Sequence, residues 1–296
     1  MWNELIGAVG LGLIWTLMTF GLYISFRILD VADMTVEGSL TMGAAITAVC
    51  ISAGIPPLVA LLIAILGGML AGMVTGLLNT ILKIPPLLSG ILTMIALWSI
   101  NLRIMGKANV SLLKMPTVFS FFTDTFGLAK NISVILVAFL FVLAMFFILY
   151  WFFGTELGCS IRATGNNPHM ARAQGIHTES MIRLGLVLAN GLVALSGGLI
   201  AQSQCFADIQ MGTGSIVIGL ASLIIGEVLF GRSTFKRALI SVIFGAVTYR
   251  IIIAMVLKMG MPANDLKLFT AITVAIALSL PVLKNWFNRK RAAGKE

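Results

Sequence analysis

The chain has 296 residues, of which 59% are hydrophobic and 10% are charged, with a formal net charge of +9. Soluble domains carry about a quarter charged residues, so this composition excludes a protein whose main solvent is water. The apolar residues form blocks long enough for helices that cross a hydrocarbon core of ~30 Å, and they lack the alternation of a membrane β-barrel. We therefore predict one all-α domain over residues 1–296, a polytopic membrane bundle of roughly eight to ten spans.

Nine candidate spans follow one another along the chain. The first is expected to be retained, because neither a basic run nor a small-residue cleavage site accompanies it. The chain breaks at Gly54-Ile55-Pro56-Pro57 and at Lys83-Ile84-Pro85-Pro86, where proline cannot continue a helix. Four spans are too short to cross as continuous helices, a pattern typical of transporters. The spans are 6–26, 39–52, 56–82, 87–100, 132–153, 181–203, 215–230, 238–257 and 268–283, and the short ones are the second, fourth, seventh and ninth.

Two features of the first three spans point to packing and to a pathway. Asp33 and Glu37 form an acidic break before the second span, where they either line a transport pathway or lie in a solvated inner loop. Gly68, Gly72 and Gly76 share one face of the third span, and small residues at this spacing let another backbone approach closely. That face belongs either inside the bundle or at a contact between subunits.

The connection 155–177 is long and polar, and it contains the signals of a short helix. Asn167 is a capping residue, Pro168 suits the first helical position, and Gly175 suits a left-handed stop. These signals predict a discrete helix at about 168–174. On physical grounds alone, this helix either simply joins two spans or docks to a soluble motor.

The residue types and spacing of this connection resemble a known cytoplasmic signature. It is similar to that of the ABC uptake permeases for branched-chain amino acids, ribose and related sugars, nucleosides and autoinducer. The resemblance implies a coupling segment at 155–180, with a coupling helix that fits a groove of the ATPase. The matching residues are Thr155, Leu157-Gly158, Arg162-Ala163, Gly165-Asn166, Ala171 and Gly175-Ile176. The residues to which the resemblance gives the coupling role are Gly165, Asn166, Asn167, Pro168, Ala171, Arg172, Gly175 and Ile176.

The resemblance extends over most of the chain. Residues 10–26, the stretch 33–39 and Met42-Gly43-Ala44 are similar to the amino-acid branch of the family, and 216–231 resembles its glycine-rich span. The chain departs from the family pattern in that fewer glycines than usual follow Gly231 and the tail is short. The resemblance implies that two copies of this chain surround a shared pore, with two ATPases and an extracytoplasmic solute-binding protein.

This chain does not contain a phosphate-binding loop of the GxxxxGK[ST] type. We therefore expect it to bind no cofactor, with ATP and Mg²⁺ held by the partner ATPase. The three cysteines are far apart and lack a nearby histidine, which argues against a metal site.

Charged and polar residues inside spans are candidates for function, because they are costly in lipid. Arg250 is expected to meet a substrate or line the pore, to form an internal ion pair, or to snorkel outward. Glu227, near the inner surface, is expected to pair with Arg232 or Arg237 as a structural or inner-gate contact. Asn79 and Asn190 are candidates for the pathway, although interhelical hydrogen bonds are the simpler explanation.

The distribution of basic residues predicts the orientation. With nine spans, thirteen of the twenty Lys and Arg residues fall on the side of the basic tail 284–296, six fall on the other side, and Arg250 lies within a span. This asymmetry predicts a cytoplasmic C-terminus and an external N-terminus in the cell membrane of a bacterium. The basic residues are better explained as anchors for anionic lipid than as a nucleic-acid surface.

We therefore predict the permease subunit of an ATP-driven importer that works by alternating access, with an amino acid as the favoured solute. An ion-coupled secondary transporter would need a coupling carboxylate deep in the bundle and, often, inverted repeats. An intramembrane enzyme would need a catalytic constellation, yet both histidines, His169 and His177, lie in one connection. A channel would have no need of the coupling signature.

Overall fold

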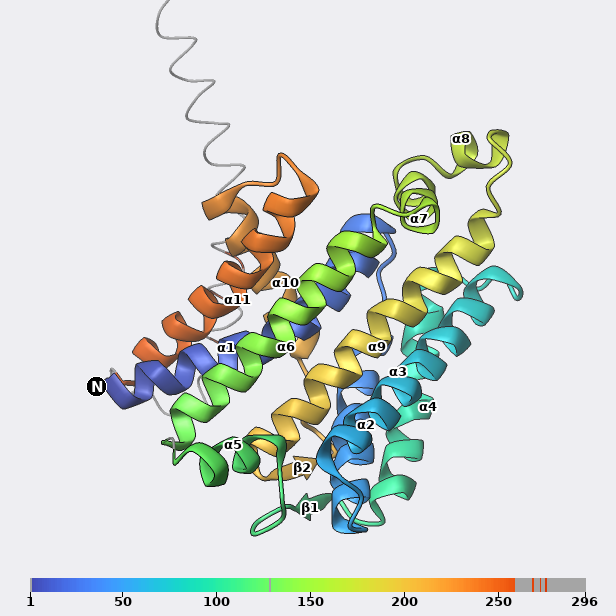
Figure 1. Cartoon of the computed structure of the whole chain (residues 1–296). Helices are drawn as coiled ribbons and strands as arrows, with labels where there is room; N and C mark the ends of the chain where they lie inside the picture. The colour runs from blue at the N-terminus through green and yellow to red at the C-terminus, as the bar shows by residue number, and fades with distance from the viewer. Residues whose placement is uncertain (1, 128, 259–267, 269–271, 273–274, 276–296) are drawn as a thin grey trace, which may run out of the picture.

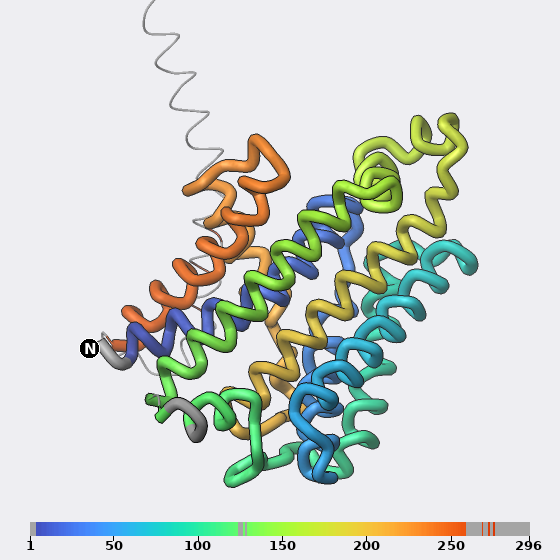
Figure 2. Tube along the Cα trace, viewed as in Figure 1, coloured from blue at the N-terminus to red at the C-terminus, as the bar shows by residue number. Residues whose placement is uncertain are grey.

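The computed structural model describes residues 2–127 and 129–258, together with 268, 272 and 275. These residues form a helical bundle, shown in Figure 1 and traced in Figure 2. Its helices are α1 (Trp2–Leu22), which continues as the π-helical η1 (Tyr23–Ile28), α2 (Thr35–Ser52), α3 (Pro57–Thr80), α4 (Pro86–Met105), α5 (Val118–Phe126), α6 (Lys130–Phe152), α7 (Glu156–Asn166), α8 (Pro168–Ala173), α9 (Thr178–Gln204), α10 (Ser215–Phe230) and α11 (Phe235–Lys258).

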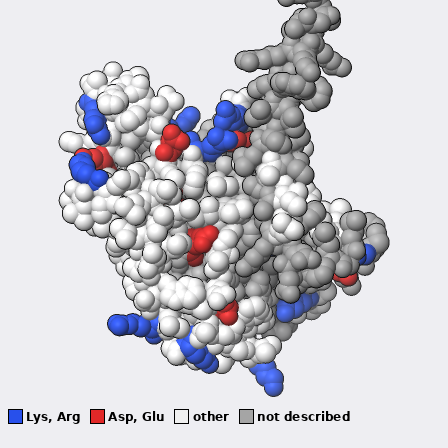
Figure 3. All heavy atoms as spheres, turned by 180° about the vertical axis from the view of Figure 1, so that it is seen from behind, with Lys and Arg blue, Asp and Glu red and all other residues white. Residues whose placement is uncertain are grey.

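The predicted class of a polytopic all-α membrane bundle is confirmed. Within the described residues, seven helices are long and apolar enough to cross a membrane, and α10 is a shorter apolar helix. In Figure 3, the charged side chains gather toward the two ends of the visible face, and a largely uncharged belt separates them. The predicted span 268–283 and the tail 284–296 lie outside the continuously described residues.

Two of the spans predicted to be short are longer in the structure. The helix expected at 39–52 begins at Thr35 and has 18 residues, and that expected at 87–100 ends at Met105 and has 20. Polar residues at the ends, such as Glu37 and Asn101, concealed these helical turns in the sequence. The prediction for 215–230 is confirmed, because α10 has these bounds.

The bundle consists of two groups of helices. One contains α2, α3, α4 and α9, and the other contains α1, α6, α10 and α11, with α1 packed against α9 between them. Within the first group, glycines bring backbones into contact. A Cβ added to Gly68 or Gly72 would overlap with a carbonyl oxygen of α9, so the predicted glycine face is internal and not a subunit contact.

The two ends of the bundle differ in structure (Figure 1). At one end, strand β1 (Asn109–Ser111) pairs in antiparallel fashion with β2 (Phe206–Asp208), and α5 lies nearby. We call this the ribbon end; none of its three elements was predicted from the sequence. At the opposite end, α7 and α8 extend beyond the spans.

Candidate functional site

The segment 155–180 contains two helices. Thr155 caps α7, since its hydroxyl accepts a hydrogen bond from the Gly158 amide. The side chain of Asn167 accepts one from the Met170 amide at 3.0 Å and so caps α8, which starts at Pro168. Gly175 has a φ of 80°, the left-handed conformation that glycine tolerates best. The helix predicted at 168–174 is therefore confirmed to within one residue, whereas α7 was not predicted.

The surface of α8 is mixed in character. Met170 is 62% exposed at the end of the molecule, although it is apolar. Ala171 is buried, and its carbonyl oxygen accepts a hydrogen bond from Ile176 that closes the turn after α8. Arg172 donates from Nε to the hydroxyl of Thr178 at 2.8 Å and so ties α8 to the start of α9. Thus Ala171 and Arg172 fix the helix, and Met170 is its largest exposed apolar side chain.

Gly165 connects this segment to the bundle. A Cβ at Gly165 would overlap with the carbonyl oxygen of Ile28, so the end of α7 lies directly on the backbone that follows α1. The neighbouring Leu29 packs in turn against Gly185 of α9. Asn166, adjacent to this contact, is exposed. A displacement of α7 would therefore press on the start of the connection 29–34.

Asp33 lies at the end of that connection and is completely buried. Its carboxylate accepts hydrogen bonds from the Thr35 amide at 2.9 Å and from the side chain of Asn190 at 2.7 Å. Asn190 also accepts one from the Ser39 hydroxyl at 2.7 Å. Asn190 is twelve residues into α9, about 18 Å from its start, so this network lies near the middle of the bundle. The solvated loop considered for Asp33 is therefore wrong, and the interhelical role of Asn190 is confirmed.

Glu37, one helical turn later, has different surroundings. It is only partly buried, and its Oε1 accepts a hydrogen bond from the Gly214 amide at 2.9 Å, immediately before α10. The hydroxyl of Thr41 accepts another from the Gly212 amide at 3.1 Å. The negative carboxylate thus compensates the positive N-terminal end of α10, which begins inside the bundle.

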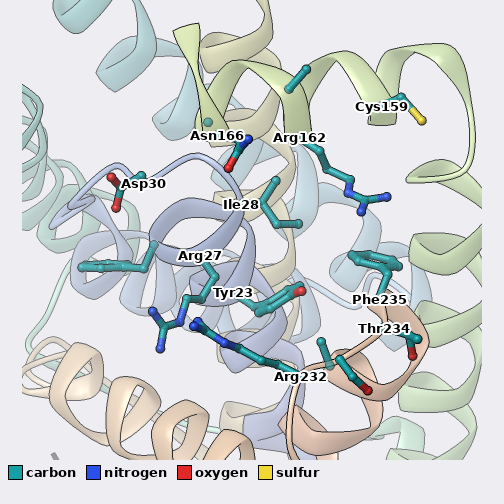
Figure 4. A pocket seen from close by; sticks show the side chains of 15 residues that line it. Tyr23, Arg27, Ile28, Asp30, Cys159, Arg162, Asn166, Arg232, Thr234 and Phe235 are labelled. Carbon is teal, nitrogen blue, oxygen red and sulfur yellow. The ribbon is translucent and has the colours of Figure 1, made fainter. Parts of the chain in front are cut away.

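The ion pair predicted for Glu227 has a different partner. The carboxylate of Glu227 binds the guanidinium of Arg27 in η1, with one hydrogen bond of 2.9 Å and a second, shorter one. The prediction of Arg232 or Arg237 is therefore wrong, because the turn after α10 directs both arginines elsewhere. Arg237 donates to the carbonyl oxygen of Phe230 at 2.7 Å, and Arg232 lines a cavity with Arg27 and Tyr23 (Figure 4).

Arg250 lies over an aromatic ring. Its guanidinium carbon is 4.0 Å from the ring centre of Trp15 in α1, a cation–π contact. Its Nε is buried and has no hydrogen-bond partner among the described residues. Arg250 also lines a cavity of ≈ 450 Å³ between α1, α6, α9 and α11. Among the described residues Arg250 forms no ion pair, and the ring of Trp15 is the partner that this part of the structure shows.

Asn79 has a local role. Its side-chain amide donates to the carbonyl oxygen of Ile84 at 3.0 Å and supports the turn between α3 and α4. Lys83 in the same turn pairs with Glu179 at the start of α9. The interhelical bond expected for Asn79 is therefore replaced by a contact within the turn.

Comparison with known proteins identifies the chain. Residues 5–278 match the model of the family described as branched-chain amino acid transport system / permease component. The chain belongs to this permease family. It is 43% identical to the tyrosine transport system permease protein of Clostridioides difficile (strain R20291), with 94% of this chain and 91% of the relative aligned. It is 34% identical to an uncharacterized protein of Rickettsia prowazekii (strain Madrid E), with 94% and 97% aligned.

The fold also resembles that of an ABC transporter. An inward-facing structure described as a metal-chelate type ABC transporter has a TM-score of 0.50 and 16% identity, covering 96% of this chain and 85% of that chain. Its family match makes the protein a multi-pass membrane permease of a binding-protein-dependent ABC importer family. It is a transport subunit and not a catalytic enzyme.

Several residues of interest were not identified from the sequence. Met170 could have been recognised, because it is an isolated apolar side chain in a polar connection. Arg27 and Trp15 could not, since their partners, Glu227 and Arg250, are at least two hundred positions away in the sequence.

Proposed function

We propose that this permease imports an amino acid of the aromatic class by alternating access, driven by ATP hydrolysis on a partner ATPase. The observation that carries this proposal is α8, a capped helix that presents Met170 at the end of the bundle. It follows α7, which packs on the bundle at Gly165. The tyrosine transport permease at 43% identity supports an aromatic amino acid as the solute.

In this proposal, α8 docks into a groove of the ATPase and α7 transmits its movement. Met170 supplies an apolar contact in that groove, and Asn167 and Gly175 set the two ends of the helix. When the ATPase closes, α7 pushes through Gly165 on Ile28, and the connection 29–34 conveys the displacement to Asp33 and α2. Contiguous backbone contacts can carry such coupling between distant sites.

The proposed pathway passes the partly exposed Glu37, because a carboxylate at this depth avoids lipid and faces protein or water. Glu37 and Thr41 hold the segment before α10, so movement of α2 would shift the start of α10 as well. Arg250, with its cavity, is a second pathway candidate. Asp33 and Asn190 position α2 and do not touch the solute, and Asn79 supports a turn.

The assembly that fits this function contains two copies of the permease, two ATP-binding subunits and a solute-binding protein on the external side. ATP and Mg²⁺ would be bound by the partner ATPase. The α7 and α8 end would face the cytoplasm of a bacterium, with the N-terminus outside, as the distribution of basic residues predicts.

Co-purification with the ATPase of the same transport system tests the proposal. The variant Met170→Glu places a charge on the exposed apolar surface of α8 and should abolish capture of the ATPase. The variant Leu113→Glu is a matched control, because Leu113 is 72% exposed and lies two residues after β1 at the ribbon end. It should capture the ATPase as the unaltered chain does.

Size-exclusion profiles of both variants in detergent should match that of the unaltered permease. If the unaltered permease captures no ATPase, or if Met170→Glu captures it fully, α8 is not the docking helix.

A further inference from the structure

A basic cavity lies between the segment 155–180 and the turn that joins α10 to α11. Its volume is ≈ 720 Å³, and η1, α7 and this turn form its walls. Arg27, Arg162 and Arg232 each come from a different one of these elements (Figure 4). The cavity is therefore formed by tertiary structure and not by one charged stretch of sequence.

Within the part of the chain that the structure describes, two of the three guanidinium groups have no carboxylate partner. Arg27 is neutralised by Glu227, whereas Arg162 and Arg232 form no ion pair with the described acids. The acid that lines the cavity, Asp30, lies apart from both of them in Figure 4. Like charges that converge on one cavity repel each other, and a bound anion relieves that repulsion.

The polar lining suits a phosphate group in particular. Asn166, Ser233 and Thr234 add side-chain hydrogen-bond donors to the arginines. Arginine binds phosphate oxygens in a planar, two-pronged geometry, and hydroxyl and amide donors complete the shell of a tetrahedral anion.

The rest of the lining is mostly apolar and includes Phe26, Ile28 and Phe235. Arg162 lies 5.3 Å from the ring centre of Phe235, and this pair also borders a second cavity of ≈ 450 Å³. Tyr150 and Trp151, at the end of α6, line that second cavity and are 48% and 71% exposed. Exposed aromatic side chains at the end of a span mark the headgroup level of a bilayer.

We propose that the cavity binds the phosphate of an anionic phospholipid, with the glycerol and acyl chains passing Phe235 toward Tyr150 and Trp151. The lipid would bridge Arg162 of α7 and Arg232 of the α10–α11 turn. Basic pockets between helices at a membrane surface recognise anionic headgroups in this way. The inference rests on these two neighbouring cavities and does not depend on the proposed solute or on the ATPase.

Cys159 provides a reporter, because it lines the same cavity and is exposed. With Cys50 and Cys205 replaced by alanine, the full chain in nanodiscs carries this one thiol. We expect maleimide to label it more slowly in discs that contain phosphatidylglycerol than in discs of phosphatidylcholine alone. Replacing both Arg162 and Arg232 with glutamine should abolish that difference.

Controls separate the lipid from other causes. A chain with Cys159→Ala and Gln174→Cys reports the effect of surface charge at an exposed position of the same segment. Equal slowing of both thiols, or no slowing at Cys159, would overturn the proposal. Protection by inorganic phosphate in phosphatidylcholine discs, with none from phosphatidylglycerol, would also overturn it and assign the cavity to a free anion.

Native mass spectrometry of the delipidated protein, with phosphatidylglycerol added back, measures the affinity for this lipid directly. Each basic residue near a membrane surface contributes about 1 kcal/mol, so Arg232→Gln, on an exposed turn, should weaken phosphatidylglycerol binding about fivefold. The double variant should weaken it about thirtyfold. Arg103→Gln, at the far end of α4, is the matched control and should bind like the unaltered chain. Equal binding by all variants would contradict the assignment.

Discussion

The seam between α2 and α9 and the segment 155–180 differ in how they are held together. In the seam, Gly43 and Gly197 place backbone directly on backbone, and the buried network of Asp33 and Asn190 crosses it. The segment 155–180 has one such backbone contact, at Gly165, but it is largely exposed and its two helices begin at side-chain caps. The seam therefore contributes to the stability of the fold, whereas the exposed segment 155–180 can bind a partner. Substitutions in the two regions should therefore separate folding from coupling.

The largest effect is expected from Gly43→Ala in the seam. The added Cβ would overlap with the carbonyl oxygen of Ala194, and both backbones are fixed by their helices. We expect the free energy of unfolding to fall by about 3 kcal/mol, which would be measured as a lower midpoint of unfolding in detergent. Gly7→Ala in α1 is the control, because no atom lies within 4 Å of the added Cβ. Equal midpoints for the two variants would show that the seam is not tightly packed.

A smaller effect is expected from Asn190→Ala. This change removes a hydrogen bond to the buried carboxylate of Asp33 and leaves the Ser39 hydroxyl without its acceptor. Because these buried groups lose their hydrogen-bond partners, the free energy of unfolding should fall by about 2 kcal/mol, measured in the same way. Asn79→Ala, which removes one partly exposed bond to Ile84, should cost less. The reverse order would mean that the network contributes little.

The smallest effect on stability is expected from Asn167→Ala in the segment 155–180. Loss of the cap should destabilise α8 by about 1 kcal/mol and leave the bundle unchanged. Faster hydrogen exchange of the Met170 amide, without a change in the unfolding midpoint, would confirm this. Asn167→Asp retains a capping oxygen and should exchange like the unaltered chain. A drop in the global midpoint would contradict the separation of the two regions.

Local signals in the sequence predicted the segment better than the seam. Asn167, Pro168 and Gly175 specify the two ends of α8. These residues are close together in the sequence, so α8 can be predicted without knowledge of any tertiary contact. The glycines of α3 predicted a close contact, but the sequence does not name α9 as the partner. Long-range pairs such as Arg27 with Glu227 and Arg250 with Trp15 depend on tertiary packing. The turns that begin α2 and end α4 were missed because polar residues interrupt their apolar pattern.

ATP-driven uptake in proteoliposomes tests the central claim most directly. The permease, its ATPase and its binding protein are reconstituted together, and uptake of labelled tyrosine is measured with and without ATP. The account predicts accumulation that requires ATP, withstands proton and sodium ionophores, and is lost in Met170→Glu but not in Leu113→Glu. Uptake that persists without ATP and collapses with an ionophore would contradict it and favour an ion-coupled transporter.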